Sequence, residues 1–257
     1  QYTHIDCTVT VLSTKGDRNT TDSLAVFGGK GAFVTEFEDA LCDGRIDLAV
    51  HSAKDMPFEL APSLDILMVL PRADAHDVLI YKKGQHPCTK HHAIVGTGSP
   101  RRAAQIPYTT KLLRGNVPTR IQKLKNGEYD AIVLAAAGLE RLGLNNDPAL
   151  EYEVLPYEQM VPAGGQGIIA IEGRRASPEA ALLAPCCNRS ALLELETERA
   201  VLRHLNASCQ EPIGVYAHIA DEQLTLHFFC ARNGHSVNRC VHGTVAQRFE
   251  LVHAVVE

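Results

Sequence analysis

The chain has 257 residues, of which 45% are hydrophobic and 21% are charged, with 25 Lys and Arg against 30 Asp and Glu. A chain of this length usually divides into two or three compact units. No apolar run approaches the roughly 20 residues that span a bilayer, and a net charge of −5 argues against a general nucleic-acid surface. The composition is typical of a soluble enzyme.

The cysteines and the start of the chain bear on its compartment. The eight cysteines show neither a zinc-binding spacing nor a dense disulfide framework. The opening residues contain no basic stretch, apolar segment or cleavage site typical of an export signal. We therefore expect a reducing, cytoplasmic compartment and no metal site.

The first part of the chain predicts an α/β unit. Residues 7–12 alternate as a strand does, residues 46–50 form an apolar run typical of a buried strand, and a helix between them ends near Gly44. The second strand passes into residues 51–57, whose final proline prevents a central ladder from continuing. Asp55 is therefore expected on a turn directly after a buried strand.

Three strand-to-helix joints follow, and each carries arginine. After a strand at 77–81, strand 93–96 leads into a helix with Ser99 as N-cap and proline at the first helical position, so that two arginines fall in the first turn. Residues 113–120 form a second joint, and strand 129–135 leads into a third. Strands that alternate with helices indicate α/β units with largely parallel sheets.

The last part of the chain predicts a smaller α+β unit. A glycine-rich turn at 162–167 precedes another strand, and residues 192–205 have helical periodicity. The loop around Cys209 is not helical, because Pro212 follows it. Beyond this loop we expect antiparallel strands, for example over 224–228 and 246–255.

The arginines at the joints point to an anionic ligand. The carboxyl ends of strands in an α/β sheet converge where ligands bind, and helix N-termini there favour anions. Guanidinium groups suit carboxylates and phosphates, so several together indicate a polyanion. A structural role in ion pairs is the alternative for any one of them. The arginines concerned are Arg101, Arg102, Arg114, Arg120 and Arg141.

Two further residues are of types suited to chemistry. Asp55, beside Lys54, is a carboxylate suited to proton transfer and to stabilising a cationic intermediate. Cys209 lies in a loop of small residues where a thiol is accessible, and a thiolate attacks carbon electrophiles to form a thioether. A turn-capping aspartate and a buried, unreactive cysteine are the alternative interpretations.

Six sequence blocks stand out when they are taken together. They are GGKG at 28–31, VHSAKDMP at 50–57, GTGSPRR at 96–102, LRGNVPTR at 113–120, LAAAGLERLG at 134–143 and SCQEPI at 208–213. In this order they closely resemble the porphobilinogen deaminase family. The similarity covers most of the chain and weakens towards its C-terminal end.

The resemblance implies a fold of two α/β domains like those of periplasmic binding proteins, with a smaller α+β C-terminal domain. We expect the first domain to comprise residues 1–70 and 163–185, the second 75–158 and the third, which carries the cysteine, 189–257. Family members begin earlier. The resemblance therefore implies a first strand and an arginine-bearing segment before Gln1, so that the chain is expected to be truncated at its start.

The resemblance also implies the chemistry. The family condenses four porphobilinogen molecules, with loss of ammonia, into the linear hydroxymethylbilane of tetrapyrrole (heme) biosynthesis, on a dipyrromethane primer attached covalently to the cysteine matching Cys209. The aspartate matching Asp55 assists the loss of ammonia and stabilises the resulting cation. Further cofactor-binding residues are implied at Ser52, Lys54, Thr97, Ser99, Arg101, Arg102, Arg114, Arg120, Gln166 and Gly167, and substrate-binding residues at Lys30, Ala135 and Arg141.

Two positions depart from the family pattern. Pro100 replaces the usual leucine, a change that suits the first helical position. Glu211 stands where the family often has an apolar residue, which leaves the cysteine loop less well matched than the other blocks.

Two other classes of protein stay open. A two-lobed solute-binding or effector-sensing protein for a small polyacidic ligand would explain the arginines but not Cys209. A nucleic-acid binder would need stacking surface, and seven Tyr, seven Phe and no Trp offer little. We expect a monomer whose partner is the small-molecule substrate porphobilinogen, with neither a nucleic-acid nor a membrane partner.

Overall fold

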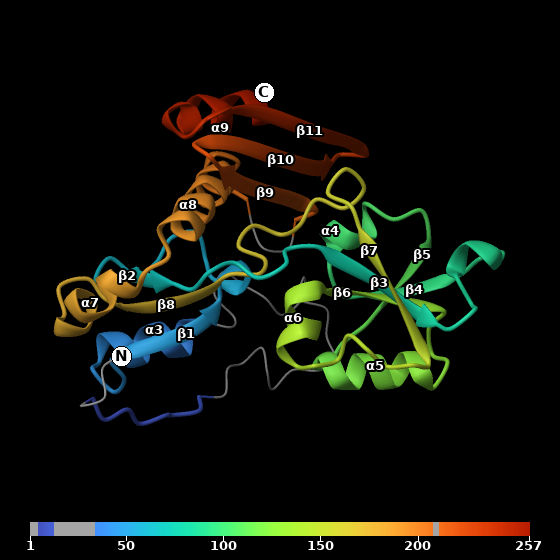
Figure 1. Ribbon diagram of the computed structural model, residues 1–257, viewed down its shortest axis with the longest axis horizontal. Helices are drawn as coiled ribbons and strands as arrows, with labels where there is room; N and C mark the ends of the chain where they lie inside the picture. The colour runs from blue at the N-terminus through green and yellow to red at the C-terminus, as the bar shows by residue number, and fades with distance from the viewer. Residues whose placement is uncertain (1–4, 13–33, 208–210) are drawn as a thin grey trace.

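The structure, a computed structural model, describes residues 5–12, 34–207 and 211–257. Its strands form three separate sheets of three, five and three strands. In Figure 1 the first two sheets lie side by side and the C-terminal sheet lies above them, with α8 between the first sheet and the C-terminal one. Within the described residues no helix is long and apolar enough to span a bilayer.

The first sheet is built from strands that are distant in sequence. Its order is β1-β8-β2, and the central strand β8 is antiparallel to both neighbours. The prediction of largely parallel sheets is therefore wrong here, because a strand that returns after the second unit is inserted between two earlier ones. The elements are α3 (Thr35–Cys42), β1 (Leu48–Ser52), β2 (Leu64–Val69), β8 (Ile169–Arg174), α7 (Pro178–Leu183) and η3 (Ala184–Cys186).

The second sheet has the order β5-β4-β6-β3-β7 and is mixed. Strand β4 is parallel to β5 and β6, whereas β3 is antiparallel to β6 and β7. The three predicted strand-to-helix joints are the passages from β4, β5 and β6, so their arginines start from the same edge of the sheet. The elements are β3 (Asp77–Lys82), η2 (Pro87–Thr89), β4 (Ile94–Thr97), α4 (Pro100–Ala103), β5 (Thr109–Leu112), α5 (Val117–Lys125), β6 (Ala131–Ala135), α6 (Ala136–Arg141) and β7 (Leu150–Leu155).

The C-terminal unit is an antiparallel sheet of order β11-β10-β9 with two helices on one face. The core of this unit lies between the sheet and the helices α8 and α9. It contains Leu224, Leu226 and Phe228 of β10, Val201 of α8 and Val252 of α9. Phe229, on the opposite face, is buried as well, so both faces of this strand are covered. The elements are α8 (Arg189–His204), β9 (Ile213–Ala220), β10 (Gln223–Arg232), β11 (His235–Thr244), η4 (Val245–Gln247) and α9 (Arg248–Val256).

Helix α8 joins two cores. Ala191 and Leu195 in its first half are buried with Val69 and Ala170 of the first sheet. Residues one to two turns later pack in the C-terminal core. One rigid helix of 16 residues therefore fixes the C-terminal unit against the first sheet.

Two predicted strands are wrong. Residues 7–12 belong to no strand, and Val9 and Val11 are each 88% exposed, so their alternation finds no partner strand among the described residues. The segment 246–255 forms η4 and the helix α9 rather than a strand. Val252 and Val255, three residues apart, are both buried, and this helical spacing outweighs the local preference of valine for strands.

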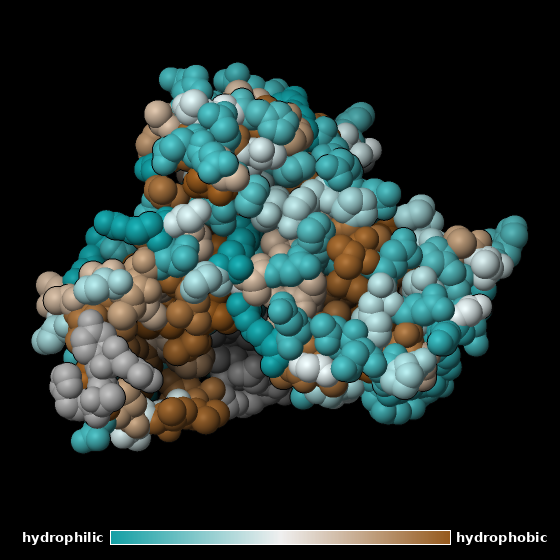
Figure 2. Space-filling view, viewed as in Figure 1, coloured by the Kyte–Doolittle hydropathy of each residue, from teal (hydrophilic) through white to brown (hydrophobic). Residues whose placement is uncertain are grey.

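Polar and apolar surface is unevenly distributed. Figure 2 shows mostly hydrophilic residues over the C-terminal and five-stranded units, whereas hydrophobic residues gather over the first unit beside the part drawn in grey. Val50 on β1 is 66% exposed. The first unit therefore presents the larger apolar surface on this face.

Candidate functional site

The catalytic candidate Asp55 lies directly after β1. The strand ends at Ser52, and the short helix η1 (Ala53–Asp55) follows. Asp55 and Ser52 are exposed, as a group that meets a ligand must be, whereas Lys54 is partly buried. Burial lowers the pKa of the Lys54 ammonium, and the nearby Asp55 carboxylate opposes this effect. The predicted turn and the Lys54–Asp55 neighbourhood are therefore present in the structure.

A buried carboxylate holds the first arginine pair. Asp77, the first residue of β3, is 0% exposed. Its Oδ2 accepts a hydrogen bond from Nη1 of Arg101 at 2.8 Å, and its Oδ1 accepts one from Nε of Arg102 at 2.9 Å. Although burial alone would raise it, the two guanidinium groups hold the pKa of Asp77 well below its usual range. These contacts agree with the alternative interpretation of Arg101 and Arg102 given above, a structural role in ion pairs.

Both arginines also bind the backbone. Nη1 of Arg101 donates to the carbonyl of Val161 at 2.6 Å, and Nη1 of Arg102 donates to the carbonyl of Val133 at 2.9 Å. The buried Nε of Arg101 has no hydrogen-bond partner within the described part of the chain. Arg101 and Arg102 are thus fixed in place, and the buried N–H at Nε of Arg101 is left without an acceptor among the described residues.

The cap predicted for α4 is confirmed. Oγ of Ser99 accepts the backbone N–H of Arg102 at 3.4 Å, which satisfies a donor at the helix start. The hydroxyl of the buried Thr97 accepts the N–H of Ser99 at 3.1 Å. These two side chains set the direction in which the arginine-bearing turn leaves β4.

Gln166 connects the site across the units. Its side-chain amide donates to Oδ1 of Asp77 at 3.1 Å and to the carbonyl of Ala75 at 2.7 Å, while its Oε1 lies 3.4 Å from Nζ of Lys54. Gln166 is 1% exposed. It therefore links the Asp55 turn of the first unit to the Asp77 ion pairs of the second.

The turn that carries Gln166 requires glycine. Gly165 has φ +79°, and a Cβ on it would lie 2.9 Å from the backbone of Ala53 and Lys54. Gly167 has φ +86°, and a Cβ there would lie 2.4 Å from the carbonyl oxygen of Ala73. Both residues thus combine a left-handed backbone with close approach to neighbouring backbone.

We expect Gly167→Ala to destabilise the protein by about 2–4 kcal/mol, because left-handed strain adds to the clash with Ala73. Urea unfolding checks this value. Gly143→Ala is the matched control: Gly143 has φ +63° but open space around its Cβ position, so only the backbone strain of roughly 1–2 kcal/mol applies. Equal losses in the two variants would contradict the packing argument.

The next two arginines, Arg114 and Arg120, interact electrostatically with each other, and Arg120 also interacts with Arg102 and Asp55. Burial, together with the neighbouring Arg102 and Arg114, lowers the pKa of Arg120 to about 10, and Asp55 opposes this effect. Nε of Arg120 donates to the carbonyl of Gly115 at 2.6 Å. Three guanidinium groups from two joints are thus close enough to repel one another, which favours binding of an anion among them.

Arg141 and Ala135 lie at the third joint. Ala135 ends β6 and pairs with Asp77 across the sheet. Nη2 of the exposed Arg141 donates to the carbonyl of Gly167 at 2.7 Å. Arg141 therefore binds the same glycine turn that carries Gln166.

The sequence reasoning missed a second ion pair, at the junction with α8. Nη1 of Arg72 lies 2.6 Å from Oε1 of Glu198, and Nε of Arg72 donates to the carbonyl of Gln166 at 3.0 Å. Oε2 of Glu198 accepts the N–H of Gly165 at 2.6 Å. Although burial lowers it, the Glu198 carboxylate raises the pKa of Arg72 above its usual value. Asp77 was also missed, and its signal was a charge directly before a run of four buried, largely apolar residues at 78–81.

Two predicted site residues lie outside the described residues: Lys30 and Cys209. The described chain resumes at Glu211, whose carboxylate lies 2.6 Å from Nη2 of Arg232. The family-atypical Glu211 is thus paired with a charge on β10.

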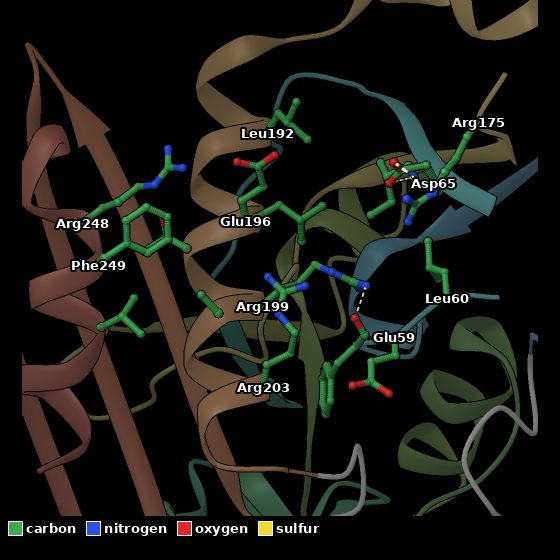
Figure 3. A pocket seen from close by; sticks show the side chains of 16 residues that line it. Glu59, Leu60, Asp65, Arg175, Leu192, Glu196, Arg199, Arg203, Arg248 and Phe249 are labelled. Carbon is green, nitrogen blue, oxygen red and sulfur yellow. Dashed lines mark hydrogen bonds and ion pairs between the residues drawn. The ribbon is translucent and has the colours of Figure 1, made fainter. Parts of the chain in front are cut away.

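A cavity of about 530 Å³ lies elsewhere, between α8, α9 and the segment before β2. Figure 3 shows Arg199 and Arg203 on α8 facing it, with Phe249 on α9 opposite. Of the predicted site residues that the structure describes, none lines it. It is therefore distinct from the arginine site.

The comparisons with known proteins identify the family. The family model described as "Porphobilinogen deaminase, dipyromethane cofactor binding domain" matches residues 1–181, and "Porphobilinogen deaminase, C-terminal domain" matches residues 192–253. The porphobilinogen deaminase of Roseiflexus sp. is 42% identical over 267 residues, with 100% of this chain and 87% of the relative covered. That of Chromobacterium violaceum is 43% identical over 232 residues, with 88% and 74% covered.

Solved structures resemble the chain only distantly. The VFT2 domain of BvgS from Bordetella pertussis has a TM-score of 0.39 at 16% identity, covering 59% of this chain and 65% of that one. The periplasmic aliphatic sulphonate binding protein SsuA from Escherichia coli has a TM-score of 0.39 at 14% identity, covering 66% and 57%. At these scores the similarities support no argument about ligand or site.

Fold and site together define an α/β protein with a separate C-terminal domain and a guanidinium-rich site beside one exposed carboxylate. Both the α/β class and the separate C-terminal domain were predicted and are confirmed. The chain belongs to the porphobilinogen deaminase family.

Proposed function

We propose that this chain is a transferase, a porphobilinogen deaminase (hydroxymethylbilane synthase), which condenses four porphobilinogen molecules into hydroxymethylbilane with loss of ammonia in heme biosynthesis. The observation that carries the proposal is the link through Gln166 between Lys54, beside Asp55, and the Asp77 carboxylate that holds the first arginine pair. A substrate with two carboxylates needs several cations, and a leaving amino group needs a proton donor nearby.

Asp55 is the acid in this proposal. Its exposed side chain donates a proton to the amino nitrogen of porphobilinogen, so that ammonia leaves. The resulting carboxylate then stabilises the positive charge left on the substrate. Lys54 and the arginines bind the carboxylates of the substrate, so that its amino group is left to Asp55.

The donor set fits a dipyrromethane cofactor. Such a group carries several carboxylates, and the site offers crowded guanidinium groups together with the unsatisfied buried Nε of Arg101. Cys209 would hold the cofactor as a thioether, and Ser52, Lys54, Thr97, Ser99, Arg101, Arg102, Arg114, Arg120, Gln166 and Gly167 would surround it. When bound, the cofactor supplies the nucleophilic pyrrole carbon. Lys30, Ala135 and Arg141 would contact the substrate.

Intact mass spectrometry tests the cofactor assignment. We expect the purified chain to carry the added mass of two condensed pyrroles and Cys209→Ala to lack both this mass and activity. Cys186→Ala, which changes an exposed thiol, is the control and should retain both. An active protein with an unmodified thiol at position 209 would exclude Cys209 as the site of cofactor attachment. An inactive chain with an unmodified thiol would favour the two-lobed binding protein.

A second test addresses the cationic group. We expect Arg120→Gln to lower kcat/KM at least about tenfold, since it removes a charge-assisted bond to a carboxylate. Steady-state kinetics measure this loss. Arg203→Gln is the control, because Arg203 on α8 lines the separate cavity, and it should leave kcat/KM unchanged. An equal loss of kcat/KM in both variants would rule out a specific role for Arg120.

Domain limits, assembly and compartment complete the proposal. We propose the divisions 1–70 with 163–185, 75–158 and 189–257, supported by the membership of the three sheets. We propose a monomer in the cytoplasm, without nucleic-acid or membrane partners. The seven cysteines in the described part of the chain are all free thiols.

A further inference from the structure

A thiol, an imidazole and a carboxylate lie in series at the edge of the five-stranded sheet. Cys88 is exposed on η2, in the connection between β3 and β4. Its Sγ lies 2.6 Å from Nδ1 of His86, and Nε2 of His86 lies 2.8 Å from Oε2 of Glu153 on β7. This order of groups is the one that activates nucleophilic cysteines.

The hydrogen bonds set the imidazole in the tautomer that can take the thiol proton. Nδ1 of His86 accepts the backbone N–H of Cys88 at 3.1 Å, so this nitrogen carries a lone pair. The proton is then on Nε2, where Glu153 accepts it. The carboxylate therefore orients His86 and stabilises the imidazolium that forms when Nδ1 is protonated.

The cluster is held by the sheet. Glu153 pairs with Leu79 across β3 and β7, strands that lie side by side in Figure 1. The ring of Tyr81 on β3 meets the ring of His86 edge-on at 4.8 Å. Tyr108, before β5, is a further titratable group near the thiol, and burial together with the charges of Cys88 and Glu153 raises its pKa.

The cluster is separate from the arginine site. Residues of η2 enter β4 at its amino end, whereas Ser99 and the arginines follow its carboxyl end. The proposed condensation does not use Cys88, and activity is therefore not the readout of its role.

We infer that Cys88 is a modification site, an activated thiol that forms mixed disulfides with small disulfide molecules. The proton of Cys88 passes to Nδ1 of His86, which then no longer accepts the backbone N–H of Cys88. The thiolate attacks one sulfur of the disulfide. The bond between the two disulfide sulfurs breaks as the new bond to Cys88 forms, and the leaving thiolate takes the proton from His86. No electrons beyond those of the disulfide are needed.

The test compares alkylation rates of individual thiols in the reduced full chain with iodoacetamide at pH 6.5, followed by peptide mass spectrometry. We expect Cys88 to react at least about tenfold faster than Cys42, which is also exposed but has the hydroxyl of Ser63 as its neighbour at 3.5 Å. With oxidised glutathione, the adduct should form first at Cys88. Equal rates at Cys88 and Cys42 would overturn the inference.

His86→Asn is the matched variant, because its Oδ1 still accepts the N–H of Cys88 and keeps the helix cap but does not take the thiol proton. It should reduce the rate at Cys88 to that of Cys42, and Glu153→Gln should give an intermediate rate. Unchanged rates in both variants would overturn the role of the cluster. The urea midpoint of each variant shows that folding is preserved.

Discussion

Asp55→Asn is expected to lower kcat at least about 100-fold, the usual contribution of a positioned acid or base. Asparagine keeps the size and hydrogen-bonding capacity of the side chain but neither donates the proton to the leaving amino group nor offsets positive charge. Because Asp55 is exposed and on a turn, the fold does not depend on its charge. Single-turnover and steady-state rates with porphobilinogen measure the effect.

Asp43→Asn is the control for Asp55. Asp43 is an exposed carboxylate after α3 and lies outside the arginine group, so this change should leave kcat as it is. The intact mass of Asp55→Asn shows whether the cofactor is still bound. A variant with normal kcat would exclude the acid role of Asp55, whereas loss of the cofactor mass would move its role from catalysis to cofactor loading.

Asp77→Asn is expected to destabilise the protein by about 3–5 kcal/mol, the typical result of removing one partner from a buried ion pair. Arg101 and Arg102 are 4% and 6% exposed, and both would lose their only carboxylate among the described residues. Two buried guanidinium groups would then repel each other without a counter-charge. Urea unfolding at pH 7 measures the change in the free energy of unfolding.

Asp147→Asn is the comparison for Asp77. Asp147 pairs with Lys125 at the surface, where ion pairs are screened by solvent, so the urea midpoint should hardly move. A similar small shift for Asp77→Asn would mean that the Asp77 ion pairs do not stabilise the fold.

The pH dependence of stability is a second test of the Asp77 ion pairs. A depressed pKa in the folded state means that the stabilisation by Asp77 is complete above its unfolded pKa of roughly 3.9 and is lost as the pH falls below that value. Asp77 therefore contributes no change in stability between pH 7 and pH 5. If the difference in the free energy of unfolding between wild type and Asp77→Asn disappeared between pH 7 and pH 5, Asp77 would not be ion-paired in the folded state.

Short-range patterns were enough to locate much of the candidate site. The turn after β1 and the cap at Ser99 depend on neighbouring residues, and the structure has both where they were predicted. The helix that ends near Gly44 and the joints after β4, β5 and β6 are also present. Side-chain periodicity, proline and capping residues act within a few positions, so they can be read along the chain.

Long-range packing set the rest. The insertion of β8 between β1 and β2 joins residues more than 100 positions apart, and a local pattern holds no information on such a partner. Asp77 meets Arg101 and Arg102, and Glu198 meets Arg72, only after separate segments are buried together. Burial makes an unpaired charge costly, so each buried charge must have a partner of opposite sign. Which residue that partner is depends on the folded arrangement of the segments.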